Sequence, residues 1–257
     1  MKICILASGS KGNSIYIESR NTAIIIDQGL SHKELKKRMA LRGLDPAKIS
    51  AILVTHEHSD HIGGVGISSR YLNIPVYATS GSLTKMGKIF NGSEEVIAIE
   101  SGVTLNIGPL EIHPFSISHD AEDPVQYCIH SGKKKISVVT DIGFMSTLVT
   151  ERIKNSDLLV IEANHDVDML VNGPYPWQLK QRVKGRTGHL SNRSAAETIF
   201  NISKNGKPKV VLAHISGENN RADVAEKEVR ELFEKHDRKL GLLLSASQSE
   251  PTPIVEI

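Results

Sequence analysis

The hexapeptide at residues 56–61, His-Glu-His-Ser-Asp-His, concentrates side chains that bind metal ions. Three imidazoles and a carboxylate fall within six positions, shortly after an apolar run that is typical of a buried strand. Side chains alternate along an extended segment, so His56, His58 and Asp60 share one side and His61 faces a neighbouring position. Imidazole and carboxylate ligands suit divalent metal ions. The cluster predicts a metal centre; capping or simple hydrogen bonding by one or two of the histidines is the alternative.

Three further candidate ligands each follow a hydrophobic run elsewhere in the chain. His119 ends "FSISH", Asp141 ends "ISVVTD" and His214 follows "VVLA". One histidine at a strand end is commonly a hydrogen-bonded polar residue, but three such positions strengthen one another. A carboxylate can bridge two cations, so Asp141 is the candidate bridge, with His119 and His214 completing the two sites.

The elements that must position these residues follow from periodicity and turn residues. Strands are expected at 2–7, 14–19, 22–29, 51–54, 157–164, 208–216 and 253–257. Hairpins are expected at 102–119, with its turn at Gly108-Pro109, and at 125–141. Helices are expected at 31–44, 61–73, 191–205 and 222–236. The first half is hairpin-rich and the second alternates strand and helix, which predicts a mixed α/β architecture with helices outside the sheets.

Two of the expected helices have a clear apolar face. The helix at 31–44, capped by Ser31, would bury Leu35 and Met39 together with Leu41 or Leu44. The helix at 222–236 would turn inward Val224, Val229, Leu232 and Phe233.

The composition of the 257 residues is ordinary for a soluble globular protein, with 39% hydrophobic and 23% charged residues. No repeat, low-complexity tract or long linker interrupts the chain, which predicts a single domain over 1–257. The net charge of +2 indicates no general affinity for polyanions, so a nucleic-acid binder would have to concentrate its positive charge locally.

Cellular location is predicted from the cysteines and the apolar runs. Cys4 and Cys128 lie in strand-like apolar segments, which favours buried free thiols in a reducing cytosol. The N-terminal apolar run is too short for a signal peptide, and no run approaches the roughly 20 apolar residues of a membrane span. We expect a cytoplasmic protein without a membrane partner; nothing in the sequence indicates an oligomeric state.

The motif H-x-H-x-D-H, with Asp27 closing a strand upstream and then His119, Asp141 and His214, resembles the metallo-β-lactamase superfamily over nearly the whole chain. The resemblance implies an α/β fold of the metallo-β-lactamase type, an αββα four-layer sandwich. "LASGSKGNSIYI" at the start and "GHLSN" near residue 189 are similar to the YycJ-type (WalJ) bacterial metallo-hydrolases. "VIEANHD" and "VLAHISGENN" are similar to motifs of nucleic-acid-processing members. The segment between Asp141 and Glu162 has no room for the inserted domain of β-CASP nucleases.

The resemblance also implies a set of ligands for two divalent ions, which could be zinc, manganese or iron. The first ion is assigned His56, His58 and His119, and the second Asp60, His61 and His214, with Asp141 between them. A hydroxide bridging two such ions can attack phosphorus. Asp60 would also orient the nucleophile or accept its proton. Asp27 would position these groups without binding an ion itself.

His189 is assigned the role of proton donor to the leaving oxygen, with Glu162 tuning it. A helix-capping or core histidine is the competing interpretation. Ser191 and Asn192 are interpreted mainly as caps, although helix N-terminal amides can also hold a phosphate of the substrate.

The stretch "LKQRVKGRTGHLSNR" concentrates positive charge in an otherwise neutral chain: Lys180, Arg182, Lys184, Arg186 and Arg193. Beside the metals it could bind a phosphodiester backbone, above all through Arg182, Lys184 and Arg186; an exposed basic loop without a partner is the alternative. Tyr175 and Trp177 could stack on a base, but the preferred interpretation is that they pack the loop down.

The leading functional hypothesis is a metal-dependent phosphodiesterase acting on nucleic acid, with DNA favoured over RNA and exonucleolytic action favoured by the compact site. The first alternative is a thioester or ester hydrolase of the glyoxalase II or lactonase type. Clustered arginines speak against that alternative, because a carbonyl hydrolase has less use for them. The second alternative is a non-catalytic metal-binding partner of another protein, which the full set of ligand types disfavours.

Overall fold

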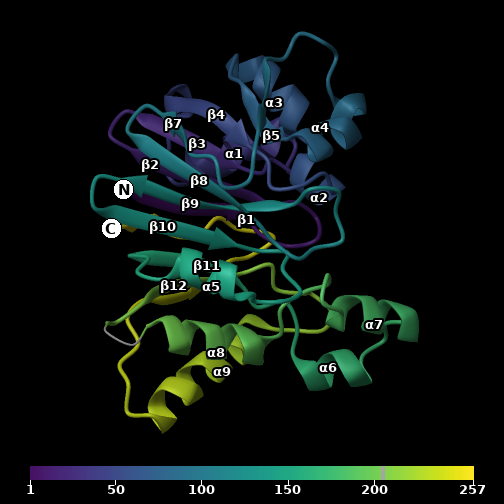
Figure 1. Ribbon diagram of the computed structural model, residues 1–257, viewed down its shortest axis with the longest axis vertical. Helices are drawn as coiled ribbons and strands as arrows, with labels where there is room; N and C mark the ends of the chain where they lie inside the picture. Colours follow the sequence, from purple (N-terminus) through teal and green to yellow (C-terminus); the bar gives the residue numbers. More distant parts are fainter. Residues whose placement is uncertain (204–205) are drawn as a thin grey trace. The chain divides into compact units, whose positions relative to one another are not determined.

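The computed structural model describes residues 1–203 and 206–257, and the last two residues of the helix expected at 191–205 lie outside the described part. The chain divides into two compact units, whose helices and strands are labelled in Figure 1. Unit 1 comprises residues 1–116, 121–134 and 247–257, and unit 2 comprises residues 117–120 and 135–246. The expected single domain over 1–257 stays a prediction.

One sheet of unit 1 is mixed, with its first strands antiparallel and its later strands parallel. Isoleucine-rich strands in the middle are buried, as expected where both faces are covered. In sheet order the strands are β14 (Val255–Glu256), β1 (Lys2–Ala7), β2 (Ser14–Ser19), β3 (Thr22–Ile26), β4 (Ile49–Leu53), β5 (Val76–Thr79) and β6 (Val96–Ile99).

A second set of strands in unit 1 forms an antiparallel meander of β7 (Leu105–Ile107), β8 (Leu110–Ser116) and β9 (Val125–Ser131). The turn between β7 and β8 falls at the predicted glycine, Gly108, whose φ of 54° is left-handed. The Tyr127 hydroxyl on β9 donates to the carbonyl of Val54, 2.6 Å away, just past the end of β4. The meander is thereby fixed against the strand that leads into the histidine motif.

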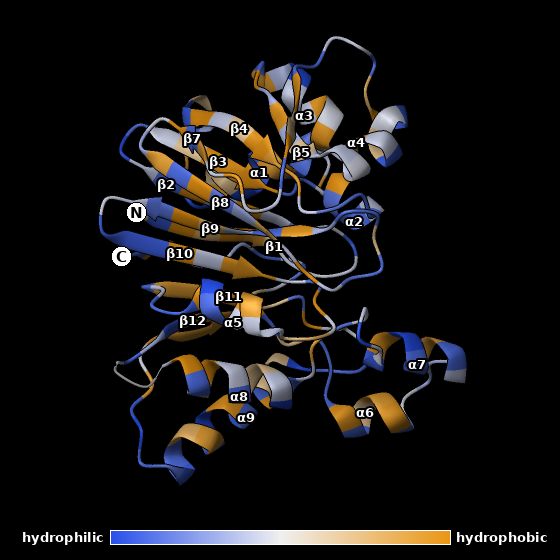
Figure 2. Cartoon of the chain, viewed as in Figure 1, coloured by the Kyte–Doolittle hydropathy of each residue, from blue (hydrophilic) through white to orange (hydrophobic). Residues whose placement is uncertain are grey.

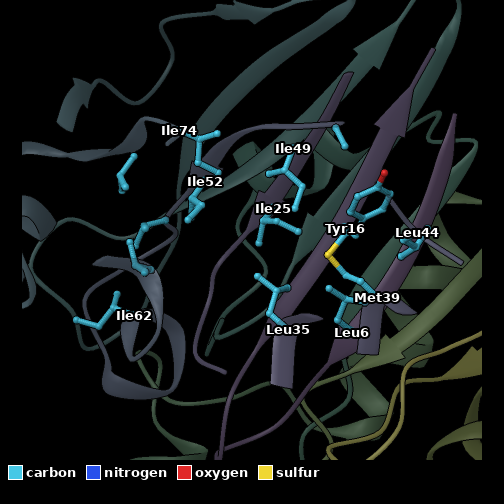
Figure 3. Packing of buried hydrophobic residues seen from close by; sticks show 14 of the residues in the cluster. Leu6, Tyr16, Ile25, Leu35, Met39, Leu44, Ile49, Ile52, Ile62 and Ile74 are labelled. Carbon is cyan, nitrogen blue, oxygen red and sulfur yellow. The ribbon is translucent and has the colours of Figure 1, made fainter. Parts of the chain in front are cut away.

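The helices of unit 1 pack on the first sheet around a continuous apolar core (Figure 3). Leu35, Met39 and Leu44 are buried in it, whereas Leu41 is 62% exposed, so Leu44 is the core residue of the two alternatives. The Ser31 side chain accepts from Glu34 N and caps the first helix, as predicted. The helical segments are α1 (His32–Leu41), η1 (Pro46–Lys48), α2 (Ser59–Ile62), α3 (Val65–Leu72), α4 (Ser80–Met86) and η2 (Gly87–Ile89).

Unit 2 is built on parallel strands: β10 (Lys134–Val139), whose first residue belongs to unit 1, β11 (Leu158–Glu162), β12 (Lys209–Ala213) and β13 (Leu243–Ser245). Its helices are α5 (Thr147–Ile153), α6 (Val167–Asn172), α7 (Trp177–Lys184), α8 (Asn192–Ile202) and α9 (Ala222–Lys235). α8 and α9 pack together through Phe200 and Phe233, whose ring centroids are 5.4 Å apart. Val229 and Phe233 of α9 are buried as predicted, while Val224 and Leu232 are half-buried.

The pattern did not predict β5, β6, β13 or the helices α4 to α7. All are short, and a sequence pattern of three to eight residues carries little periodicity. The basic stretch at 180–193 was expected as a loop, but its first five residues belong to α7 and its last two begin α8. Among the described residues, no helix has the length and apolarity needed to cross a membrane.

Candidate metal centre

The four donors of the hexapeptide gather at the end of β4 in unit 1. The His56 and His61 ring centroids are 4.1 Å apart, and His56 Nε2 lies 3.0 Å from His58 Nδ1. His58 is the residue before α2, and Asp60 and His61 lie in its first turn. Asp60 Oδ2 lies 3.4 Å from His61 Nε2. The strand thus ends in three imidazoles and a carboxylate, as the sequence indicates.

Asp27 fixes the orientation of this cluster from the end of β3. Its Oδ2 lies 2.8 Å from His61 Nδ1 and accepts from the Thr55 hydroxyl, while its Oδ1 accepts from Thr55 N. A carboxylate on Nδ1 selects the tautomer in which His61 Nε2 is an acceptor, which is the form that binds metal. The geometry is that of a group that positions ligands.

Sequence reasoning missed Asn13 and Gly29, which hold Asp60 in place. The Asn13 amide donates to Asp60 Oδ2 at 3.2 Å, and Asn13 N donates to the backbone carbonyl of Asp60 at 2.7 Å. A Cβ on Gly29 would lie 1.8 Å from that same carbonyl oxygen, so only glycine fits there. The sequence signal nearest to this contact is the glycine-rich turn "SGSKGN" at residues 8–13, which contains Asn13.

The donors of unit 2 lie at the carboxyl ends of neighbouring parallel strands. Asp141 follows β10, Glu162 ends β11 and His214 follows β12. Parallel strands end at the same edge of a sheet, and His189 joins the group from the loop before α8. One ligand atom from each of these four residues lies within 4.8 Å of the others.

Glu162 is the hub of this group. Its Oε1 lies 2.8 Å from His189 Nδ1 and 2.9 Å from His214 Nδ1, and its Oε2 accepts from the backbone N–H of Ile142 and Leu190. Burial alone would raise the pKa of Glu162, but the interactions with His189 and His214 outweigh it and lower that pKa to about 2. The buried carboxylate is therefore ionised at neutral pH. Its contact with His214 was not anticipated from the sequence.

The pKa of His189 shifts the other way. Burial would lower it, but the Coulomb attraction and hydrogen bond of Glu162 raise it above its ordinary value. His119, whose ring centroid is 5.5 Å from that of His189, has its pKa lowered, chiefly by burial. His189 thus retains a proton more readily than His119 does.

The donors of both units fit divalent metal ions. All are imidazole nitrogens or carboxylate oxygens, and the Nδ1 atoms of His61 and His214 face carboxylates, which leaves Nε2 for an ion. Asp27, Asp141 and His214 have φ values of 57°, 52° and 51°. Left-handed backbone at a non-glycine residue costs on the order of 1 kcal/mol and clusters at functional sites. Cys4 and Cys128 are both buried within strands, as predicted.

Sequence comparisons identify the family of the chain. A family model described as "Beta-lactamase superfamily domain" matches residues 22–215. Exodeoxyribonuclease WalJ of Streptococcus pneumoniae is 36% identical over 100% of this chain and 98% of its own length. Exodeoxyribonuclease YycJ of Bacillus anthracis is 33% identical over 96% of this chain and 94% of its own. The chain belongs to the beta-lactamase superfamily.

Solved structures show the same fold. The metallo-beta-lactamase fold protein YhfI from Bacillus subtilis matches 98% of this chain and 98% of its own, with a TM-score of 0.73 at 18% identity. Unliganded yeast PDE1 matches 100% of this chain with a TM-score of 0.72 at 13% identity. The predicted fold class, the αββα sandwich of the metallo-β-lactamase type, and the resemblance to the YycJ-type (WalJ) proteins are confirmed.

In this member of the superfamily, the predicted substrate-binding side chains differ in availability. Arg182 pairs with Asp120 at 2.6 Å, and the Arg186 guanidinium lies 4.2 Å from the Phe144 ring centroid. Lys184 is exposed at the end of α7. These three cations lie near the surface of unit 2, where a polyanion has access to them.

Ser191 and Asn192 act within the fold. The Ser191 hydroxyl accepts from Ser194 N and caps α8, as the sequence predicts. Asn192 is 97% buried and exchanges two amide hydrogen bonds with Asn220. A contact of either side chain with substrate stays a prediction.

The structure shows the surroundings of Trp177 and His165, which the sequence did not predict. Trp177 is 73% exposed at the start of α7, so the interpretation that it packs the loop down is wrong. His165 is buried, and burial lowers its pKa to about 4. It is neutral at physiological pH, and its carbonyl accepts from Asn192 N at the start of α8.

Proposed function

We propose that this protein is a metal-dependent phosphodiesterase that removes nucleotides from an end of DNA. The observation that carries the proposal is the shared carboxylate of Glu162, which holds His189 beside the ligand candidate His214. A nucleotide alkoxide is a poor leaving group and needs a proton as the bond to phosphorus breaks. A thioester or activated ester needs no such donor, so this pair favours phosphodiesters over the small-molecule alternative.

The metal sites are part of the proposal. Two divalent ions, with zinc, manganese and iron as the candidates, would take His56, His58 and His119 on one side and Asp60, His61 and His214 on the other, with Asp141 shared. When bound, divalent ions supply Lewis acidity at phosphoryl oxygens and make water acidic enough to attack at neutral pH. The imidazole and carboxylate chemistry within each unit supports this assignment.

The chain's own residues handle the protons and position the reactants. Asp60, held by the Asn13 amide, would orient the attacking water. His189 Nδ1–H donates to ionised Glu162, and in the imidazolium form of His189 the Nε2 atom would also carry a proton, which it would offer to the leaving oxygen. The raised pKa of His189 keeps that proton available near neutral pH. Arg182, Lys184 and Arg186 would hold the phosphodiester backbone, with Ser191 and Asn192 as further predicted contacts.

DNA is favoured over RNA because the two full-length relatives bear the name exodeoxyribonuclease. A ribonuclease relative, Ribonuclease J 1 of Streptococcus pyogenes, matches only 55% of this chain at 28% identity. A nuclease of this kind would act in the cytoplasm.

The test is to incubate the metal-loaded protein with end-labelled DNA and RNA and to resolve the products. We expect DNA strands to shorten progressively from one end and His58→Ala to abolish this while the circular dichroism spectrum stays unchanged. Internal cuts only would refute the exonuclease assignment. Turnover of a thioester with intact nucleic acid would establish the small-molecule alternative instead.

A further inference from the structure

One face of α7 presents an aromatic ring, an amide and a cation to solvent. Trp177, Gln181 and Lys184 follow the spacing i, i+4, i+7 and therefore lie on the same side of the helix. All three are exposed, whereas Val183 on another side is buried. We call these three residues the α7 face. The exposed indole offers a flat aromatic face on which a planar ring can stack.

The surroundings of the α7 face are positively charged. Residues 177–188 contain Lys180, Arg182, Lys184 and Arg186 and no acidic residue. Lys180 Nζ donates to the carbonyl of Val171 and so ties α6 to α7, and Arg182 is paired with Asp120. Lys184 is the cation of the exposed face itself. Its charge suits a polyanion.

The helix leads directly to the proposed proton donor. His189 N donates to the carbonyl of Val183 at 2.8 Å. A Cβ on Gly188 would lie 2.2 Å from the carbonyl oxygen of Arg182, so the loop carrying His189 packs tightly on the end of α7. Trp177 precedes Val183 by six residues, about 9 Å along the helix axis. The α7 face therefore extends from Lys184, next to the loop that carries His189, to Trp177 near the start of the same helix.

We propose that the α7 face binds the unpaired bases of a single-stranded nucleic acid, with a base stacked on Trp177 and a phosphate at Lys184. This inference rests on the proposed function and narrows its substrate to strands with an unpaired segment. Aromatic stacking is indifferent to base identity but needs an accessible base face, which a duplex does not offer. A subunit interface would be more apolar: α7 is largely hydrophilic in Figure 2, in contrast to α6.

Trp177 is the only tryptophan of the chain, so its fluorescence reports the α7 face alone. The metal-loaded protein is titrated with a short phosphorothioate strand, which is cleaved slowly. We expect quenching by the single strand and little change with the same sequence as a blunt duplex or with an abasic strand. Binding measured by anisotropy without quenching would overturn the proposal, as would equal quenching by the duplex.

Substitutions test the same point independently. Trp177→Ala should weaken single-strand affinity about tenfold, and Trp177→Phe should retain most of it. Val171→Ala is the matched control, because it removes an exposed apolar side chain from neighbouring α6. Unaltered affinity of Trp177→Ala would sink the proposal.

Other occupants give different signals. An emission shift that depends on protein concentration without nucleic acid would assign the face to a second copy of the chain, and a shift on anionic vesicles would assign it to a membrane; either result overturns the inference. If the wild type shortens labelled DNA and Trp177→Ala binds it equally well, only this inference fails. If the wild type hydrolyses neither DNA nor a chromogenic phosphodiester, the proposed function fails.

Discussion

At the residue scale, the chemistry depends on carboxylates that contact the Nδ1 atoms of neighbouring imidazoles and fix their orientation. Glu162 does this for His189 and His214, and Asp27 does it for His61. Each imidazole is left with one defined nitrogen for its task. Such pairs are invisible to spacing rules, because their members lie 27 to 52 positions apart.

Replacing His189 tests its role as a proton donor. His189→Ala should slow hydrolysis of a phosphodiester with an alkoxide leaving group by about 10²- to 10⁴-fold. With a nitrophenolate leaving group the loss should be much smaller, because that anion leaves without a proton. The measurement is kcat on both substrates, and equal losses would remove the donor role.

A second prediction concerns Glu18, which lies far from the donors in sequence. Burial would raise its pKa, but hydrogen bonds from Lys48 Nζ and the Tyr16 hydroxyl outweigh burial and lower it below the ordinary 4.5. The stabilisation is present above pH 4.5 and is lost as pH falls through the lowered value. Glu18→Gln should reduce the free energy of unfolding at pH 7 by roughly 1–2 kcal/mol, and the gap should narrow as the pH is lowered below 4.5.

Urea denaturation at pH 7 and at a series of pH values below 4.5 measures the difference in the free energy of unfolding between the wild type and Glu18→Gln. Glu231→Gln is the control, because its pairing with Lys227 is an exposed one along α9. A gap for Glu18→Gln that persists unchanged in acid would contradict the linkage.

At the scale of elements, sequence patterns worked where apolar runs were long and bounded by turn residues. The strands at 2–7 and 14–19 were predicted with their bounds, and Ser31 and Ser191 were recognised as caps. The residue types of the donors also follow from the sequence. α7 was missed because its eight residues are mostly polar and tertiary contacts, such as Arg182 with Asp120, hold it.

Asn13 could not be predicted for a related reason. Its identity suits any turn, and only the fold brings its amide to Asp60. Leu41 and Leu44 were equivalent by spacing, and the end of α1 at Leu41 decides between them, since the chain then turns Leu44 inward. The local sequence pattern indicates candidate residues of this kind, and tertiary packing determines which of them is buried or makes the contact.

The basic residues in α7 and in the loop after it give a prediction at the scale of elements. Replacing Lys184 and Arg186 by alanine should weaken nucleic-acid binding and reduce the slope of log affinity against log salt by about 0.7 per cation for a single strand. Adding Arg182→Ala should change the slope less, because Asp120 already neutralises that guanidinium.

Lys227→Ala with Arg230→Ala is the matched control, removing the same charge from exposed positions of α9. Fluorescence anisotropy over a range of salt concentrations measures the slope. If the α9 control and the Lys184 and Arg186 variant behave alike, the segment has no special role.

At the scale of the whole molecule, folding and metal binding should be linked. An ion that binds only the folded chain stabilises it by about 2.7 kcal/mol at a hundredfold excess over its Kd. For a chain of this size, chelation should lower Tm by roughly 5–10 °C. Calorimetry with and without chelator measures the shift, and elemental analysis identifies the ions.

Variants from each unit provide the control. His58→Ala in unit 1 and His214→Ala in unit 2 should each bind less metal and show a smaller Tm shift on chelation. A wild-type protein whose Tm is indifferent to chelation, and whose metal content is negligible, would argue against the metal centre itself.

The left-handed backbone at Asp27, Asp141 and His214 has an evolutionary consequence. Glycine or asparagine would relax each position, so variants selected for heat resistance alone should drift toward those residues and lose turnover in the process. An aspartate or histidine at such a position gives up some backbone stability for its side chain, as the proposed metal sites would require.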